Sequence, residues 1–209
     1  MSEYGYIPEA PEQSFGNNKG IFTPKDIYDL TRADKYTNYG QLELIETINQ
    51  DTSVSAVVFD DLRDYDIHII FVSELQGGDA ELQGRLSTDG GTTFYSGGRY
   101  DYAMQFCQAG GSVGDRKGIN QSRFQRLAKT GNHTGATGQG YITFYNLKDS
   151  NLYSMLTTLN YSMDNNPLGI YQRGGQVLRN KEQHNAIQLF QNTGTLQGKF
   201  SIYGVRSYT

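Results

Sequence analysis

The chain has 209 residues, of which 36% are hydrophobic and 19% are charged, a length typical of one domain or of one domain with an arm. The formal net charge of −4 disfavours general nucleic-acid binding, which needs lysine and arginine side chains to neutralise phosphates. The single cysteine, Cys107, excludes an internal disulfide framework. The first residues are acidic and proline-containing, unlike a signal peptide, and the longest apolar run, IIFV at 69–72, is too short to cross a membrane. We therefore expect a soluble protein.

Residues 1–22 contain two prolines and few aliphatic side chains, and this composition predicts an extended arm. A helix is expected next, from Pro24 to Lys35, because Thr23 suits the N-cap position and a proline is tolerated in the first turn. Ile27 and Leu30 follow at helical spacing. Their apolar stripe is narrow, so the helix needs a surface to dock on, either a neighbouring subunit or its own β domain.

Beyond Gly40 the hydrophobic pattern has a period of two, which predicts β-strands. In the strand expected at 99–106, for example, Tyr100, Tyr102, Met104 and Phe106 share one face. Asp89-Gly90-Gly91 is a hairpin signal. About nine strands separated by glycine and asparagine turns favour a β-sandwich, with a jelly roll as the first choice. The clearest strand patterns lie at 53–59, 65–73, 99–106, 140–147, 151–163, 185–191 and 198–208.

The strand at 65–73 is apolar on both of its faces, which is typical of a strand covered on both sides. We expect Ile67, Ile69 and Phe71 to be buried there. In the last strand, Phe200 and Ile202 are the corresponding core residues.

Residues 107–139 interrupt this pattern, since they are rich in Gly, Ser, Asn and Gln and carry a local charge of +4. SRFQRLAKTG, at 122–131, could be one more strand. The remainder is long for a plain connection, so it is either a functional or interface loop or an ordinary solvated one. Its basic residues could meet an acidic surface such as DDLRDYD, at 60–66, on a neighbouring copy.

No catalytic or metal-binding pattern is present in the sequence. The histidines, at 68, 133 and 184, lie in different segments without metal-ligand spacing, and we expect an inert thiol at Cys107. DDLRDYD lacks the residue order of a calcium-binding EF-hand loop, and neither a phosphate-binding loop nor a serine nucleophile elbow occurs. We expect a protein that is not an enzyme and has no catalytic residue, metal or cofactor.

The sequence is rich in tyrosine, with 16 residues, and tyrosine combines a flat apolar face with a hydroxyl group. Such side chains can stack on sugars, and Tyr100 and Tyr102 are the candidate glycan contacts. The alternative is that these tyrosines only cover the sheet.

Three stretches resemble structural proteins of marine tailed bacteriophages, especially those of cyanobacteria and related ocean hosts. The most specific is the opening, YGYIPEAPEQSFGNNKGIFTPKDIYDLTRADKY. GQGYITFYNLKDSNLYSMLTT is similar to a strand, turn and strand of the same family, and GTLQGKFSIYGVRSY resembles the closing strand of phage fibre and decoration domains. The resemblance covers most of the chain. It implies a particle component with a jelly-roll-like domain, and it supplies no catalytic residues.

These features together predict an all-β, jelly-roll-like sandwich at 39–209, preceded at 1–38 by an extended arm and one short helix that attach it to a particle. The expected function is that of a virion structural protein, assembled in the host cytoplasm: a decoration, short fibre or fibre-adaptor subunit that touches host glycans. A free-standing lectin-like domain or a glycan-active enzyme is the alternative. The candidate particle anchor is Tyr6, Phe15, Ile21, Phe22, Ile27 and Leu30.

The expected partners are other virion proteins of the head or tail, host-surface polysaccharide and further copies of the chain. A homo-oligomer is predicted, with a trimer as first choice, because phage appendages are usually symmetric. The candidate subunit contact is Arg116, Lys117, Arg123 and Arg126. Neither nucleic-acid binding nor membrane insertion is expected.

Overall fold

The structure is a computed structural model that describes residues 13–14, 17–18, 23–32, 42–131, 135–163 and 168–205. The chain divides into two compact units, Met1–Tyr39 and Gly40–Thr209, one residue beyond the division expected between 38 and 39. Each unit is described by itself.

The first unit contains helix α1 (Pro24–Arg32) and a two-stranded antiparallel sheet of β1 (Gln13–Ser14) and β2 (Asn17–Asn18). The helix begins as its sequence predicts. The Thr23 hydroxyl accepts a hydrogen bond from the Asp26 backbone N–H at 3.2 Å, and the Asp26 carboxylate accepts one from the Thr23 N–H at 2.8 Å. This reciprocal pair satisfies N–H groups that the first helical turn leaves without partners. Residues 33–35 of the expected helix lie outside the described residues.

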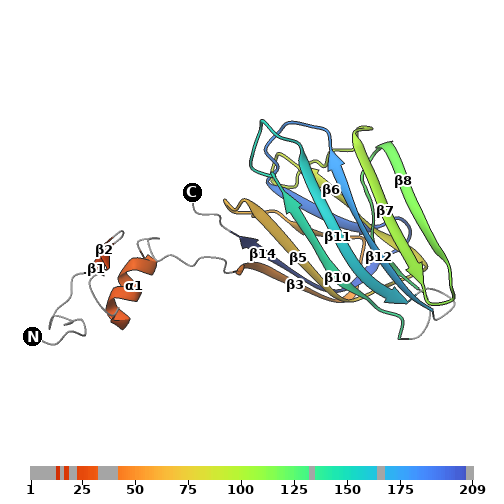
Figure 1. The fold of residues 1–209 in the computed structure, drawn as a ribbon, viewed down its shortest axis with the longest axis horizontal. Coiled ribbons are helices and arrows are strands. Elements are labelled where there is room, and N and C mark those ends of the chain that lie inside the picture. The colour runs from red at the N-terminus through yellow and green to blue at the C-terminus, as the bar shows by residue number, and fades with distance from the viewer. Residues whose placement is uncertain are drawn as a thin grey trace, which may run out of the picture. The chain divides into compact units, whose positions relative to one another are not determined.

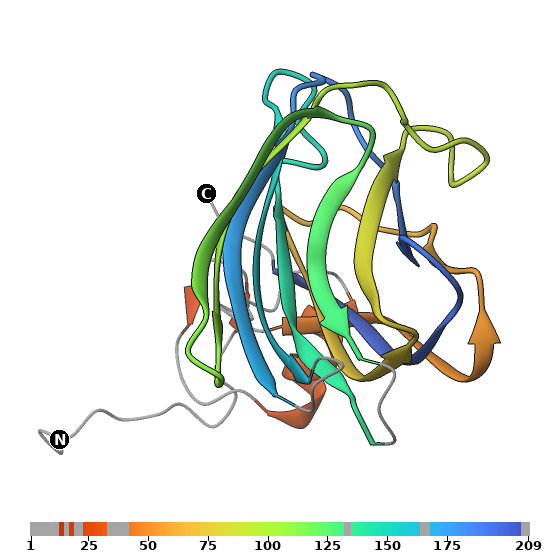
Figure 2. The ribbon, with the colours of Figure 1, turned by 90° about the vertical axis from the view of Figure 1, so that its right-hand side faces the viewer.

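The described part of the second unit forms an eight-stranded and a four-stranded sheet, and all strand pairs are antiparallel (Figures 1 and 2). The large sheet has the order β3 (Leu42–Val54), β14 (Leu196–Val205), β5 (Ile67–Gly77), β10 (Gly138–Tyr145), β11 (Ser154–Met163), β12 (Gly169–Leu178), β7 (Tyr100–Gln108) and β8 (Val113–Gln121). The small sheet has the order β4 (Ala56–Phe59), β13 (Ala186–Gln191), β6 (Ala80–Ser87) and β9 (Phe124–Thr130).

Figure 2 shows the two sheets as two layers, so the prediction of an all-β sandwich is confirmed. The jelly-roll topology stays a prediction.

The hydrophobic core lies between the two sheets. Aromatic rings in its centre meet edge to face, with ring centroids 4.7 Å apart for Tyr100 and Phe124 and 6.0 Å apart for Phe124 and Phe144. Phe200 and Ile202 of β14 are fully buried in the same cluster, as predicted. The face of strand 99–106 expected to carry aromatic side chains is therefore the inner face, and Tyr100 on it is buried in the core.

The buried face of β5 is the opposite of the one predicted. His68, Ile70 and Val72 are buried, whereas Phe71 is 40% exposed and Ile67 and Ile69 are only partly covered. The expectation of a buried Ile67, Ile69 and Phe71 is wrong, because both faces of this strand are apolar and alternation alone does not say which one meets the other sheet. The large sheet thus carries apolar side chains on its outer face.

Two further predictions, one of a strand and one of a hairpin, also need correction. Strand 53–59 is two strands, since β3 ends at Val54 in the large sheet and β4 begins at Ala56 in the small one. The segment at Asp89-Gly90-Gly91 is a turn but not a hairpin, because it joins β6 and β7, which lie in different sheets. The Asp89 carboxylate holds this loop by accepting hydrogen bonds from the Ser87 hydroxyl and from the Thr93 N–H and hydroxyl.

Residues 107–139 are mostly strand. They contain β8 and β9, and β9 falls within the expected strand SRFQRLAKTG. The expectation of a long loop is therefore wrong, while a functional or interface role of this segment stays a prediction. The glycine- and asparagine-rich composition of β8 is compatible with a strand here because β8 is the edge of the large sheet and its side chains are mostly exposed.

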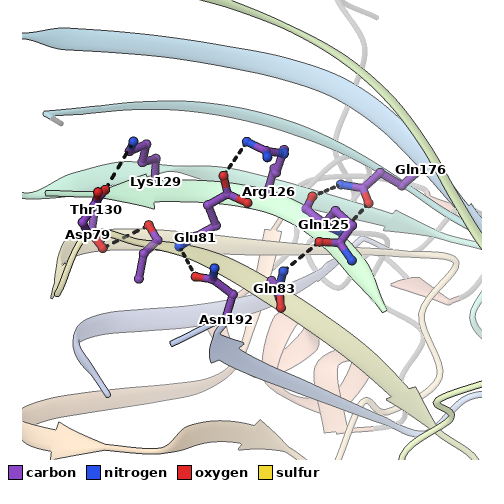
Figure 3. A network of polar contacts seen from close by, with 10 residues as sticks. Asp79, Glu81, Gln83, Gln125, Arg126, Lys129, Thr130, Gln176 and Asn192 are labelled. Atoms are coloured by element: carbon purple, nitrogen blue, oxygen red, sulfur yellow. Dashed lines mark hydrogen bonds and ion pairs between the residues drawn. The ribbon is translucent and has the colours of Figure 1, made fainter. Parts of the chain in front are cut away.

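Polar side chains tie β9, at the edge of the small sheet, to β6 and to the large sheet (Figure 3). The Gln176 side chain of β12 accepts a hydrogen bond from the Gln125 backbone N–H at 2.8 Å and donates one to the Gln125 carbonyl at 2.6 Å. Gln125 in turn accepts a hydrogen bond from Gln83 at 2.7 Å, and Arg126 pairs with Glu81. The clamp between Gln176 and Gln125 fixes β12 at the middle of the site described next.

Candidate functional site

The candidate site is on the outer face of the large sheet, which points away from the small sheet. Large apolar side chains are well exposed on this face, including Phe71 and Tyr141 at 40%, Met155 at 46% and Tyr161 at 50%. Contiguous exposed apolar surface on a soluble domain usually marks an interaction site. The strand pairing explains how this surface is shaped.

A row of small side chains crosses the strands of this face. Ala103 of β7 lies opposite Gly175 of β12, Gly175 lies opposite Thr157 of β11, and Thr157 lies opposite Thr143 of β10. On the other side of Ala103 the row ends at Lys117 of the edge strand β8. Because neighbours in register point to the same side of a sheet, the row forms a low floor that runs across the strands.

Larger side chains flank this floor on both sides. In each strand, one wall residue lies two positions before the floor residue and the other lies two positions after it, so the residues of each wall are paired across the strands. The first wall consists of Gln105, Arg173, Leu159 and Tyr141, and the second of Asp101, Val177, Met155 and Tyr145.

Two hollows of about 640 and 730 Å³ lie along these walls, within the size range of ligand sites. The first is lined by Gln105, Arg173 and Tyr141 among others, and the second by Tyr145, Met155 and Val177 among others. They share Ala103, Lys117 and Thr157, and we call the two together the groove. Figure 1 shows the strands that carry it, β8, β7, β12, β11 and β10, side by side.

The two ends of the groove differ in chemistry. At the β8 end, Lys117 is exposed. Arg173, on the central strand β12, is also exposed, and its guanidinium donates to the Gln105 side-chain oxygen at 3.4 Å. At the β10 end, Tyr141 lies beside Phe71, with ring centroids 6.2 Å apart, and the Tyr145 hydroxyl is 3.4 Å from that of Thr157. Flat aromatic surface beside amide, hydroxyl and guanidinium groups can stack on and hydrogen-bond a sugar ring.

The two described histidines, His68 and His184, do not line the groove. Within the described part of the chain no group of three or more His, Cys, Asp or Glu side chains could hold a metal ion. His184 and Ser154 are hydrogen-bonded at 2.9 Å, but both are fully buried. Burial lowers the pKa of His184 to about 4, because the imidazolium form would lose its hydration. His68 is likewise buried and lies outside the groove, and His133 is outside the described residues.

The two predicted glycan contacts lie on the same face of β7, opposite the floor of the groove. Tyr100 is 1% exposed, its hydroxyl donates to the Tyr95 carbonyl at 3.0 Å, and burial raises its pKa. A glycan cannot reach this side chain, so the prediction at Tyr100 is wrong, for the reason that the aromatic face of β7 is the inner one. Tyr102 borders the second hollow, but it alternates with Ala103 of the floor and is paired with the buried Gln176, so its side chain lies on the other face of β7. A role of Tyr102 in glycan binding stays a prediction.

The four predicted subunit contacts lie in different places. Arg116 and Lys117 are on β8, where the Arg116 guanidinium lies 5.0 Å from the Phe106 ring centroid. Arg123 lies 5.9 Å from the Phe190 ring centroid, beside the small sheet, and Arg126 is paired with Glu81. These residues do not form one basic patch, and a role in subunit contact stays a prediction for each.

Of the predicted particle anchor, Tyr6, Phe15, Ile21 and Phe22 lie outside the described residues. Ile27 and Leu30 are on α1, where Ile27 is 37% exposed and Leu30 is half-buried. No helix in the described part of the chain is both long and apolar enough to span a membrane.

Most groove residues were not found from the sequence. The alternation of Met155, Leu159 and Tyr161 on one face of a strand is visible there, but not that this face points outward. A further signal is the pair Gly174-Gly175 inside β12, because glycine within a strand often marks a place where another molecule or backbone comes close. Comparison with protein-family models, with curated proteins and with solved structures found no match.

Proposed function

We propose that this protein is a non-enzymatic bacteriophage virion protein, a decoration, short fibre or fibre-adaptor subunit, whose β-sandwich binds host-surface glycan in the groove. The groove is the observation that carries the binding function. The virion part rests on the resemblance of the opening sequence to structural proteins of marine tailed phages.

The shape of the groove favours a glycan over a compact ligand. It is an open trough across five neighbouring strands, with aromatic side chains at one end and hydrogen-bonding side chains at the other. An extended chain of sugar rings can lie along such a floor, while a small compact ligand would leave most of it in contact with water. The lining side chains are held by a continuous ladder of paired strands, so little ordering is needed when a ligand binds.

In this proposal the two units have different functions. The first unit, with its capped helix, attaches the protein to the particle, and the second presents the groove. A free-standing carbohydrate-binding domain would use the same groove without a particle. The two alternatives are distinguished by whether mass spectrometry finds the protein in purified virions.

Filling the groove tests the binding function directly. A Cβ added at Gly175 meets only the Leu156 carbonyl oxygen, at 3.8 Å, an ordinary contact, so Gly175→Tyr is accommodated by the fold and projects over the floor. We expect this variant to melt like the wild-type protein and to lose binding to immobilised polysaccharides, with alginate, dextran and laminarin as probes.

The matched control is Gly78→Tyr, in the turn between β5 and β6, where an added Cβ has no atom within 4 Å and which lines neither hollow. It should keep full binding. If Gly175→Tyr binds as well as the wild-type protein, or if the wild-type protein binds none of the probes, the groove is not a glycan site.

A further inference from the structure

The groove is positively charged, although the chain as a whole is acidic. Two cationic side chains, Lys117 and Arg173, face the first hollow against one anionic side chain, Asp115, while the formal charge of the chain is −4. In the second hollow the acidic residue is Asp101. Its carboxylate is already paired with Arg179, at 2.7 Å, so it adds little negative field to the groove.

Lys117 and Arg173 are the cations available to a ligand. Both are exposed, and within the described part of the chain neither forms an ion pair with a carboxylate. Lys117 ends the floor of the groove, and Arg173 stands on its first wall. Arg116, in contrast, alternates with Lys117 along β8 and lies against the Phe106 ring, on the opposite face of the sheet. Cations on one side of an open groove attract a ligand that carries negative charge.

The length of the groove indicates how much of a ligand it holds. From β8 to β10 it crosses four gaps between neighbouring strands, about 19 Å in all at the usual strand spacing. That span holds several sugar rings in a row. The aromatic side chains Tyr141 and Tyr145 lie at the β10 end, with Arg173 on the central strand and Lys117 at the other end, and they can stack on rings there.

From this arrangement we infer that the ligand is an acidic polysaccharide, bound as an extended internal stretch with its carboxylate groups toward Lys117 and Arg173. This inference rests on the proposed glycan-binding function and adds the chemical class of the glycan. Carboxylates on successive sugar units meet the ammonium and guanidinium groups, and the guanidinium can form two parallel hydrogen bonds to one carboxylate.

The test compares an acidic with a neutral oligosaccharide series on the full-length protein. The probes are alginate oligomers, which carry one carboxylate on every unit, and laminarin oligomers, which carry none, measured by titration calorimetry. We expect binding to alginate oligomers that strengthens as the oligomer lengthens and weakens as salt rises, since salt screens exposed charges. Neutral oligomers of the same length should bind at least about tenfold more weakly.

The Lys117→Gln/Arg173→Gln double variant should lose about tenfold in affinity for alginate and little for laminarin. The matched control is Arg99→Gln/Lys181→Gln, which changes the net charge equally at residues that line neither hollow, and it should bind normally. Circular dichroism and melting check that each variant is folded.

The possible failures are distinguishable. Equal binding of acidic and neutral oligomers, or an alginate affinity unchanged by the Lys117 and Arg173 substitutions, would overturn the acidic class while leaving a glycan groove in place. Equal losses in the two double variants would assign the effect to net charge and overturn the local contact. Absence of binding to both series would overturn this inference and the proposed function together.

Discussion

At the scale of single residues, the two buried histidines make stability depend on pH. His184 is fully buried, its Nδ1 lies 2.9 Å from the Ser154 hydroxyl, and burial lowers its pKa to about 4. Burial also lowers the pKa of His68. An unfolded histidine titrates near 6.5, so between these values the unfolded chain binds protons that the folded protein does not.

Stability should therefore be fully present above about pH 6.5 and fall as the solution is acidified toward pH 4. We expect the free energy of unfolding to drop by on the order of 1 kcal/mol per pH unit in this range. Urea unfolding between pH 7 and 4.5 measures it, and His184→Gln, which does not titrate, should show a shallower slope. This pH range lies above the titration of Asp89, because its hydrogen bonds lower its pKa to about 2. The stabilisation that Asp89 provides is lost only at lower pH. A pH-independent stability would contradict this reading.

A second prediction at this scale concerns the two faces of β5. Ile70 is completely buried, whereas Ile69 is partly exposed on the outer face. Truncation of Ile70 to Ala should lower the free energy of unfolding by about 2–5 kcal/mol, because it removes apolar contacts and leaves a cavity. Ile69→Ala should cost about 1 kcal/mol or less. The two variants are matched in chemistry and adjacent in sequence, so equal losses in chemical denaturation would show that the assigned face is wrong.

At the scale of elements, a glutamine joins the two sheets. Gln176 of β12 is 5% exposed and pairs through both atoms of its amide with the backbone of Gln125 on β9. β9 is the edge of the small sheet, and this pair connects it to the large sheet beside the hydrogen bonds that Thr158 and Asn160 donate to the Leu127 carbonyl.

Gln176→Ala should cost about 1–3 kcal/mol, because the Gln125 N–H and carbonyl lose their partners in a buried place. Thermal and urea melts measure this loss, with Gln105→Ala on the exposed face of the same sheet as the control. Hydrogen exchange should also speed up at Gln125. An unchanged exchange rate there, or equal losses in both variants, would count against the clamp.

At the scale of the whole molecule, the next prediction concerns how copies of the chain assemble. We propose that the protein is a homo-oligomer, with a trimer as first choice, joined through its β domain. The edge strand β8 is one place for such a contact, since Val113 and Ile119 on it are 76% and 70% exposed. An exposed sheet edge with apolar side chains favours pairing with another chain.

A chain that begins at Thr37 separates assembly from attachment. It keeps the whole second unit, so we expect it to form the same oligomer as the full-length protein by sedimentation at tens of micromolar, but to no longer join the particle. A strict monomer would refute assembly through the β domain. Decoration of particles without residues 1–36 would refute the anchoring role.

The sequence by itself determined the period-two pattern, the capped start of a helix at Pro24 and hence an all-β fold with one short helix. These features depend on residues close together in the chain. It did not determine which face of β5 is buried, since Ile67, Ile69 and Phe71 alternate with Ile70 and Val72, which are equally suited to a core. Only the pairing of distant strands decided that those residues point outward and that Ala103, Gly175 and Thr157 meet in one floor. Register between strands is a long-range property, so the groove exists only in the tertiary structure.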